Sequence, residues 1–374
     1  MPALINSPLA WKPNWPDSRQ RLIDWWNGRG LVLGMWGSLP APQPLEKLPQ
    51  PDGLDWRGQT YYLAGAERAR IDHYTLSTQA FPADFLPVKA PDMGPGSLCL
   101  HVGGEADFSQ HHTVWFKPVF AHFEDVADNP DLLFDAQDPY WLATEAYLRE
   151  AVQLARGRHL IAFPDLCNDM DILASLRDPN QLLLDLLDEP EWVHSALKAI
   201  NRAYKAVYEK IEDIVNPRRD QGTASRSFYL WSPGRTAKLQ CDTSAMFSRD
   251  MFAEFVTPRL SEICQFCDYP LYHLDGTNAL HQLDELLRIE HLRAIEWTPQ
   301  SGKPGGGDPL WFDIYRRILD SGKSLQIINI QPNEVPALLN AIGTNGIYLF
   351  PSFSSLEEVY QLQESVKALT AAPS

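Results

Sequence analysis

The chain has 374 residues, of which 44% are hydrophobic, so it can bury a sizeable core. Its 48 acidic and 32 basic residues give a formal net charge of −16, which argues against nucleic acid or an anionic membrane surface as a partner. The first residues lack the features of a signal peptide, and no apolar run approaches the roughly 20 residues of a membrane span, so a cytoplasmic protein is expected.

Short apolar runs typical of strands alternate with longer segments whose apolar residues recur at helical spacing. Strands are predicted at residues 31–36, 98–102, 113–117, 159–163, 228–231, 270–274, 293–297, 325–330 and 346–350. Helices are predicted at residues 62–78, 136–156, 190–214, 249–266, 278–287, 309–320, 332–342 and 355–370. Each of the last four strands is followed by a helix. This order favours an α/β fold with parallel strands, namely a single (β/α)8 TIM barrel.

Two segments depart from this alternation. Residues 1–60 are predicted to contain an N-terminal helix, the first strand and a proline-rich excursion that decorates the barrel. Residues 99–135 are predicted to form a β-hairpin insertion. Because nothing before the proline-rich excursion can fold alone, residues 1–374 are predicted to be one domain.

The segment from Tyr272 to Gly276 gives the strongest functional signal. It carries His273 and Asp275, two residues apart, just before the glycine ends the strand. Side chains at positions i and i+2 of a strand point to the same side, so these two are expected to project together. A histidine titrates near neutrality and is suited to proton transfer. The alternative is a buried histidine that bonds a nearby aspartate for stability alone.

Other polar and aromatic residues follow the ends of predicted strands, which is where barrel enzymes place their active sites. His273, Asp275 and Asp242 are the catalytic candidates. The candidates for substrate binding are Trp36, Asp165, Asp171, Trp231, Arg235, Glu296, Trp297 and Arg29. Several such groups at successive strand ends favour one active site over a purely structural sheet.

The chain resembles the uroporphyrinogen decarboxylase superfamily over residues 136–370. The resemblance rests on Phe163-Pro164-Asp165 through Asp171-Ile172-Leu173, on the segment from Met251 to Pro258, on Tyr272-His273-Leu274-Asp275-Gly276 and on Asn345-Gly346-Ile347-Tyr348. It implies a barrel enzyme, because this superfamily also holds cobalamin-linked methyltransferases and resembles cobalamin-independent methionine synthase.

The methyltransferase branch carries His-x-Cys at the position of His273 and Asp275, and a second cysteine after the last strand, and these thiolates hold zinc. The chain has Asp275 and Ser352 at these two places. A thiolate zinc site is therefore not expected, although a divalent metal such as zinc can bind nitrogen and oxygen ligands. The candidate ligands are His273, Asp275, Glu296 and Cys241. A corrinoid protein is expected as a partner only if the chain is a methyltransferase.

The decarboxylase branch needs no cofactor and holds the acid groups of its substrate with arginines near the N-terminus. Arg29 is a counterpart of one of them, but the segment Gly34-Met35-Trp36-Gly37-Ser38 replaces the arginine-rich stretch. The predicted function is therefore a lyase or decarboxylase-like reaction on a small carboxylated or hydroxylated substrate, with His273 as general acid or base. Two alternatives stay open: a metal-assisted methyl or alkyl transferase, and a non-catalytic barrel that binds a sugar-like or amine ligand. A homodimer is a further expectation.

Overall fold

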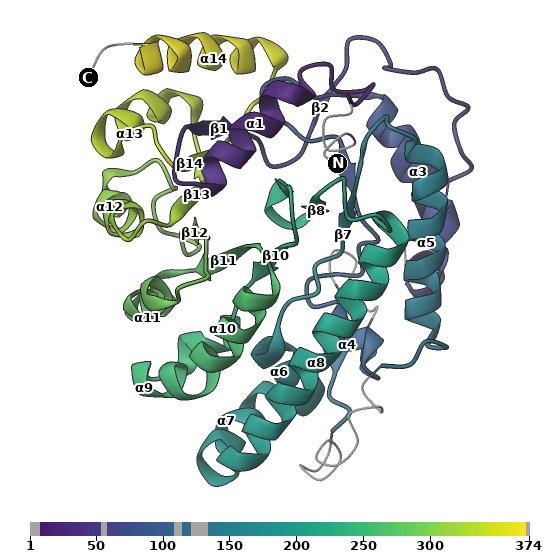
Figure 1. Cartoon of the computed structure of the whole chain (residues 1–374), viewed down its shortest axis with the longest axis vertical. Helices are drawn as coiled ribbons and strands as arrows, with labels where there is room; N and C mark the ends of the chain where they lie inside the picture. Colours follow the sequence, from purple (N-terminus) through teal and green to yellow (C-terminus); the bar gives the residue numbers. More distant parts are fainter. Residues whose placement is uncertain (1–7, 54–57, 108–113, 121–133, 372–374) are drawn as a thin grey trace.

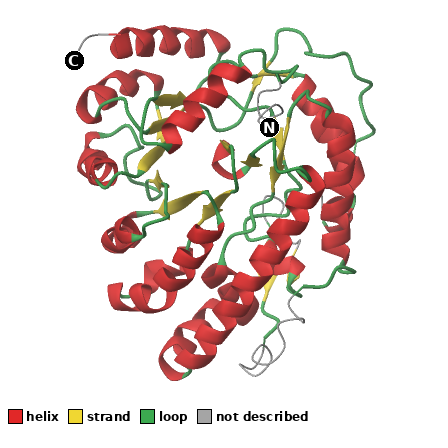
Figure 2. Cartoon of the chain, viewed as in Figure 1, coloured by secondary structure: helices red, strands yellow, loops and turns green. Residues whose placement is uncertain are grey.

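The computed structural model describes residues 8–53, 58–107, 114–120 and 134–371. Short strands lie at the centre and helices surround them, as Figures 1 and 2 show. A six-stranded sheet has the order β1 (Leu31–Leu33), β14 (Ile347–Pro351), β13 (Ser324–Ile330), β12 (Ala294–Thr298), β11 (Tyr269–Asp275) and β10 (Thr236–Leu239), with all neighbours parallel. The chain therefore has the predicted α/β fold with a parallel central sheet.

A four-stranded sheet completes the centre, in the order β4 (Val88–Lys89), β7 (Leu160–Phe163), β8 (Thr223–Ser225) and β9 (Leu230–Ser232). Its pairs are parallel except β8 and β9, which form an antiparallel hairpin. Two antiparallel pairs lie outside these sheets: β2 (Leu39–Pro40) with β3 (Gln79–Ala80), and β5 (Glu105–Asp107) with β6 (Trp115–Lys117). The second pair falls within the predicted hairpin insertion.

The helices that follow the strands have apolar faces packed on the sheets. Their bounds are α1 Trp15–Trp26, α2 Gln59–Leu63, α3 Gly65–Ser77, α4 Leu98–His101, α5 Pro139–Ala155, α6 Asp169–Arg177, α7 Pro179–Asp188, α8 Pro190–Val215, α9 Arg249–Met251, α10 Thr257–Phe266, α11 Leu283–Arg288, α12 Phe312–Asp320, α13 Val335–Ile342 and α14 Leu356–Ala371. A π-helical turn, Phe252–Val256, joins α9 to α10. In the described residues, no helix combines the length and apolar character that a membrane span requires.

Three differences from the predicted elements matter for the site. Residues 98–102 form helix α4 rather than a strand. Of the run at 228–231, Phe228 and Tyr229 belong to a turn, and Leu230 and Trp231 belong to β9, which returns antiparallel to β8 and does not add a parallel strand. The parallel strands β4, β8 and β10 were not predicted, because they are short and carry few large apolar residues.

Helix α1 covers the amino-terminal ends of the strands. The indole of Trp25 donates to the carbonyl of Leu325 at 3.2 Å, and that of Trp26 donates to the carbonyl of Trp231 at 2.9 Å. Trp15 packs edge-on against Trp231, with ring centroids 5.1 Å apart. With this end closed by tryptophans, the carboxyl ends of the strands remain available for a site.

A pair of buried histidines fastens the N-terminal segment to the fold. The rings of His73 in α3 and His159 before β7 are joined by a 2.9 Å hydrogen bond, and Trp11 stacks on both. Burial lowers the pKa of His73 and lowers that of His159 to about 4. The unfolded chain binds these protons more readily, so this contribution to stability is present above the ordinary histidine pKa and is lost as the pH falls towards 4.

We therefore expect the free energy of unfolding to fall by about 2 kcal/mol through His159 between neutral pH and pH 5. Urea denaturation of the wild type and of His159→Gln at both pH values measures this contribution. The variant should show the weaker pH dependence, whereas replacement of the exposed His291 by glutamine should leave it unchanged. Equal pH dependence in wild type and His159→Gln would contradict the assignment.

Candidate active site

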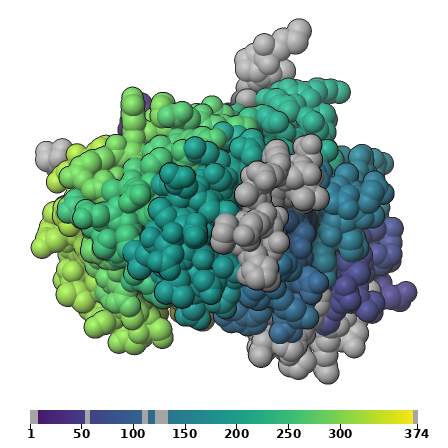
Figure 3. Space-filling view, turned by 90° about the horizontal axis from the view of Figure 1, so that it is seen from below, coloured from purple at the N-terminus to yellow at the C-terminus, as the bar shows by residue number. Residues whose placement is uncertain are grey.

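A cavity of about 830 Å³ opens where β7, β8, β10 and β11 end. Its polar lining comes from segments far apart in the sequence: Asp92, Asp165, Asp171, Ser175, Asp178, Arg226, Ser227, Lys238, Gln240, Asp242, Thr243 and His273. Trp36 and residues 114–116 line it as well. In the view from below, the teal α6–α7 region lies between the green C-terminal half and the blue and purple N-terminal third (Figure 3).

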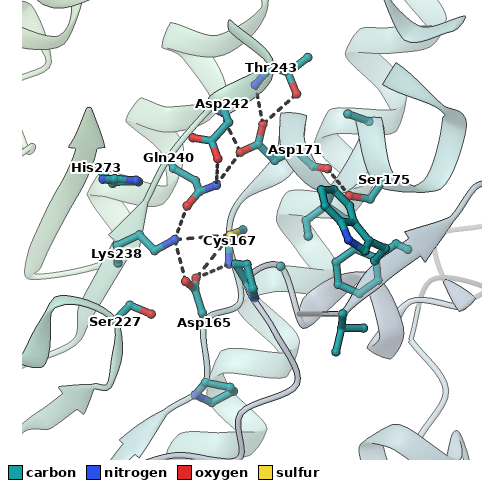
Figure 4. Close-up of a pocket in the computed structure, with 18 of the residues that line it drawn as sticks. Asp165, Cys167, Asp171, Ser175, Ser227, Lys238, Gln240, Asp242, Thr243 and His273 are labelled. Carbon is teal, nitrogen blue, oxygen red and sulfur yellow. Dashed lines mark hydrogen bonds and ion pairs between the residues drawn. The ribbon is translucent and has the colours of Figure 1, made fainter. Parts of the chain in front are cut away.

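Lys238 lies in the floor of this cavity, where Figure 4 shows it reaching towards Asp165. Its Nζ atom is 2.8 Å from Asp165 Oδ2 and donates to the side-chain oxygen of Gln240. Burial opposes the charged amine, but the charge and hydrogen bond of Asp165, together with the charge of Asp242 and the contact with Cys167, outweigh burial and raise the pKa of Lys238. The lysine is therefore a fixed cation that already has a carboxylate partner.

The side-chain amide of Gln240 connects this cation to two carboxylates. Its Nε2 donates to Asp171 Oδ2 at 2.9 Å and to Asp242 Oδ2 at 2.8 Å, while its oxygen faces Lys238. The backbone nitrogen of Gln240 donates to Asn168 Oδ1 at 2.7 Å. Both polar atoms of the side-chain amide thus have partners. These partners fit only the orientation in which the oxygen faces Lys238 and the nitrogen faces the carboxylates.

Asp171 anchors the loop after β10. Besides Gln240, it accepts hydrogen bonds from the backbone nitrogens of Asp242 and Thr243, at 3.0 and 3.1 Å, and from Thr243 Oγ1 at 2.9 Å. Four donors occupy the lone pairs that point towards the protein. Asp171 lines the cavity as predicted, but these bonds give it the role of holding Asp242 in position.

Asp242 is a carboxyl group of the cavity with a pKa raised towards neutrality. Burial and the neighbouring charge of Asp171 raise its pKa to about 6, although the positive charges of His273 and Lys238 act in the opposite direction. An aspartate with such a pKa exchanges its proton near physiological pH, as a general acid or base requires.

His273 lies on β11 beside Glu296 of β12, because the two residues are partners in the register of these parallel strands. Its Nδ1 bonds the fully buried carboxylate of Glu296, which also accepts from Thr298 Oγ1 at 2.8 Å. Burial opposes the imidazolium, but the charge and hydrogen bond of Glu296 outweigh it, so the pKa of His273 is raised. Its Nε2 is left facing Asp275, 4.0 Å from Oδ2.

We expect Glu296→Gln to lower the pKa of His273, because burial and the charge of Lys238 would then be opposed by the charge of Asp242 but no longer by that of Glu296. The variant keeps the shape of the side chain and an acceptor for Thr298. A pH titration of the His273 ring protons by NMR measures the change. The exposed Glu290→Gln serves as control, and an unchanged titration in Glu296→Gln would show that the carboxylate does not set the protonation of His273.

Asp242, His273 and Asp275 could together hold a cation. One ligand atom from each lies within 4.8 Å of the others. Of the four ligands proposed from sequence, His273 and Asp275 belong to this group. Glu296 instead bonds the far nitrogen of the histidine, and Cys241 is buried beside Ser244, with its thiol pKa raised by burial. The nitrogen and oxygen donors fit a divalent cation but not a thiolate-bound zinc.

Trp231 and Arg235 lie away from the cavity, so the expectation that they bind substrate is corrected. Because β9 runs antiparallel to β8, residues after β9 lie at the amino-terminal end of the parallel strands. Trp231 is buried there against Trp15, and Arg235 pairs with Glu212 at 2.9 Å.

Two more substrate-binding expectations are corrected. Trp297 is fully buried and packs against Trp311 on the helix side of the sheet, with centroids 5.2 Å apart, because its strand neighbour Glu296 points to the inside. Arg29 precedes β1, pairs with Asp24 at 2.9 Å and is 67% exposed. Both therefore lie outside the cavity, whereas Trp36 lines it as expected.

Lys238, Gln240, Arg226 and Phe228 line the cavity but were not predicted. The first two precede Asp242 at spacings of two, and such alternation places side chains on one side of an extended segment. That spacing was the available signal. Arg226 and Phe228 follow β8, whose three residues Thr223–Ser225 give no apolar run to detect.

No protein-family model and no curated protein matches this chain. Solved structures do match in fold. A methyltransferase from Methanosarcina mazei aligns with a TM-score of 0.59 at 12% identity, covering 95% of this chain and 99% of that chain. A B12-independent methionine synthase from Shewanella sp. W3-18-1, in complex with selenomethionine, gives a TM-score of 0.44 at 13% identity, covering 92% of this chain and 100% of that chain. The first likeness confirms, at the level of the fold, the resemblance seen in the sequence.

Proposed function

We propose that the chain is a single-domain (β/α)8 barrel enzyme that performs acid–base chemistry, of the lyase or decarboxylase type, on a small carboxylated or hydroxylated substrate. The observation that carries the proposal is the convergence of Asp242 and His273 on one wall of the cavity. Asp242 has a pKa of about 6, and His273 is held by the buried carboxylate of Glu296. Asp242 is held by Gln240 and His273 by Glu296, so the two groups are tuned by different neighbours. A pair of titratable groups in different environments is typical of acid–base catalysis.

In a decarboxylation, the bond between the substrate carbon and its carboxylate breaks, and carbon dioxide leaves. The electron pair stays on the substrate and is delocalised onto an adjacent polar group. His273, as an imidazolium, donates a hydrogen bond from Nε2 to that group and stabilises the developing negative charge. Protonated Asp242 then delivers its proton to the carbon, and solvent restores it. Gln240 and Asp171 hold Asp242 in place throughout.

A metal-assisted methyl or alkyl transferase is the second candidate, and the spacing of Asp242, His273 and Asp275 favours it. Glu296 behind His273 resembles the carboxylate that commonly orients a metal-binding histidine. A divalent cation held by these residues would polarise the substrate or activate a nucleophile. Under this alternative, a corrinoid protein is a candidate partner.

The test is incubation of the purified protein with a mixture of small carboxylic and hydroxylated acids, with substrate loss and carbon dioxide release followed by mass spectrometry. The proposal expects a compound that the wild type consumes with release of carbon dioxide or another small fragment, and that neither Asp242→Asn nor His273→Gln consumes. Asp313→Asn is the matched control, because its side chain is 92% exposed on α12. Consumption by all variants alike, or transfer of a methyl group that requires an added divalent metal, would overturn the acid–base proposal.

A further inference from the structure

We infer that Arg226 and Trp36, which both line the cavity, form a subsite for a carboxylate group of an organic substrate. This inference concerns the substrate class of the site proposed above, and it rests on the cavity rather than on the chemistry assigned to Asp242. The subsite fills the role that the sequence had suggested for Arg29 and Arg235, both of which lie elsewhere.

The turn between β8 and β9 carries the subsite. Ser225 and Leu230 are the last paired residues of this hairpin, so four residues, Arg226 to Tyr229, make the turn. Phe228 and Tyr229 have φ values of 58° and 49°, in the left-handed region that bulky side chains avoid. Two such residues in succession are strained, and strain of this kind concentrates at ligand sites.

The guanidinium of Arg226 has an aromatic contact and no acidic partner. Its central carbon lies 4.3 Å from the centroid of the Tyr229 ring. Throughout the described ranges, no carboxylate forms an ion pair with Arg226, whereas the other cation of the cavity, Lys238, is neutralised by Asp165 at 2.8 Å. Stacking on tyrosine leaves the edge of the guanidinium free to donate two parallel hydrogen bonds, the geometry that matches a carboxylate.

An aromatic surface lies next to this cation. The side chain of Trp36 is 55% exposed, and its ring packs 5.4 Å from Phe228 and 6.1 Å from Tyr229, measured between centroids. An exposed tryptophan on the wall of a cavity offers a flat apolar face to a ligand. The substrate that fits is therefore a carboxylate with an apolar or planar body.

Phe228 links the subsite to the proton-transfer residues. Its ring lies 4.7 Å from that of His273 and also contacts Trp36. Asp171 and Asp242, which flank Gln240, add negative charge that repels an anionic group, whereas Asp165 is paired with Lys238. A carboxylate is therefore directed to Arg226, so that the rest of the substrate faces Asp242 and His273.

Two pairs of probes test this inference: benzoate with benzamide, and phenylacetate with phenylacetamide. Members of a pair have nearly the same shape and differ in charge. Binding to the full chain is measured by ligand-detected NMR and by quenching of tryptophan fluorescence. We expect each acid to bind the wild type at least about tenfold more tightly than its amide, and Arg226→Gln to abolish that difference.

Matched variants separate the possible outcomes. Arg226→Lys keeps the charge without the planar donor pair and should retain only part of the preference, whereas Arg29→Gln should retain all of it. Asp242→Asn and His273→Gln should still prefer the acids, so failure of the proposed chemistry would leave this result intact. The inference is overturned if acid and amide bind alike, if neither binds the wild type, or if a folded Arg226→Gln, verified by circular dichroism, keeps the preference.

Discussion

Replacement of Lys238 by methionine is expected to lower the free energy of unfolding by about 3 kcal/mol, because removing one member of a buried ion pair leaves an uncompensated charge. The Lys238 side chain is 3% exposed and lies 2.8 Å from Asp165. It also bonds Gln240 and Cys167, so the variant loses three contacts of the cavity floor. Urea denaturation at neutral pH measures the loss.

Two further variants make this prediction specific. Adding Asp165→Asn to Lys238→Met should restore much of the lost stability, because no buried charge is then left without a partner. Lys205→Met removes a half-buried pair of similar length, Lys205 with Glu262 at 2.7 Å, and should cost about 1 kcal/mol or less. If both single lysine variants lose equal stability, or if the double variant is the least stable, the ion pair does not stabilise the floor as described.

Asp242→Asn is expected to reduce kcat about a thousandfold on the substrate identified by the proposed screen, because general acid catalysis contributes about 10²–10⁴ to the rate. In the wild type, kcat/KM should fall as the pH rises through the Asp242 pKa of about 6, since the acid form is then lost. The variant should lack this limb of the profile. A wild-type rate in the variant would remove Asp242 from the reaction.

The same variant should gain stability at alkaline pH. The pKa of Asp242 is higher in the folded protein than in an unfolded chain, so its contribution to stability is present at low pH and is lost as the pH rises through about 6. Asparagine does not ionise and avoids this loss. The melting temperature of Asp242→Asn at pH 8 should therefore exceed that of the wild type by about 1–3 °C, while Asp313→Asn should show no gain. A lower melting temperature would contradict the raised pKa.

Strand periodicity was sufficient to predict the part of the site that lies on long apolar strands. His273 and Asp275 end the buried run of β11, and Glu296, which was expected to bind substrate, is instead fully buried in β12 in register with His273. Their positions depend only on the alternation of a strand and on parallel pairing. Both can be derived from a single sequence.

Two tryptophans were wrongly predicted to lie in the site. One error concerns the direction in which a strand runs, and the other concerns the side of the sheet that a side chain faces. Trp231 follows an apolar run that looks like a parallel strand, but that run returns antiparallel after a turn with two left-handed residues. No local pattern marks such a turn when it contains no glycine. Trp297 differs from Glu296 by one position, and that single step moves a side chain from the cavity side to the helix side of the sheet.

Lys238 and Gln240 were missed for a different reason. Lys238 lies in the short strand β10 and Gln240 directly follows that strand, and each has a charged partner contributed by another segment: Asp165 for the lysine and Asp171 for the glutamine. Burial of such groups is decided by those long-range partners, and hydrophobic periodicity carries no information about them.

The central claim is that Asp242 acts as the proton donor and His273 as a hydrogen-bond donor to the developing charge, rather than as metal ligands. Elemental analysis of the wild type, His273→Gln and Asp275→Ala, each purified without chelators, tests it most directly. The account predicts no stoichiometric divalent metal in any of the three proteins. One metal ion per chain in the wild type that is lost in both variants would contradict it and would assign the group to metal-assisted transfer.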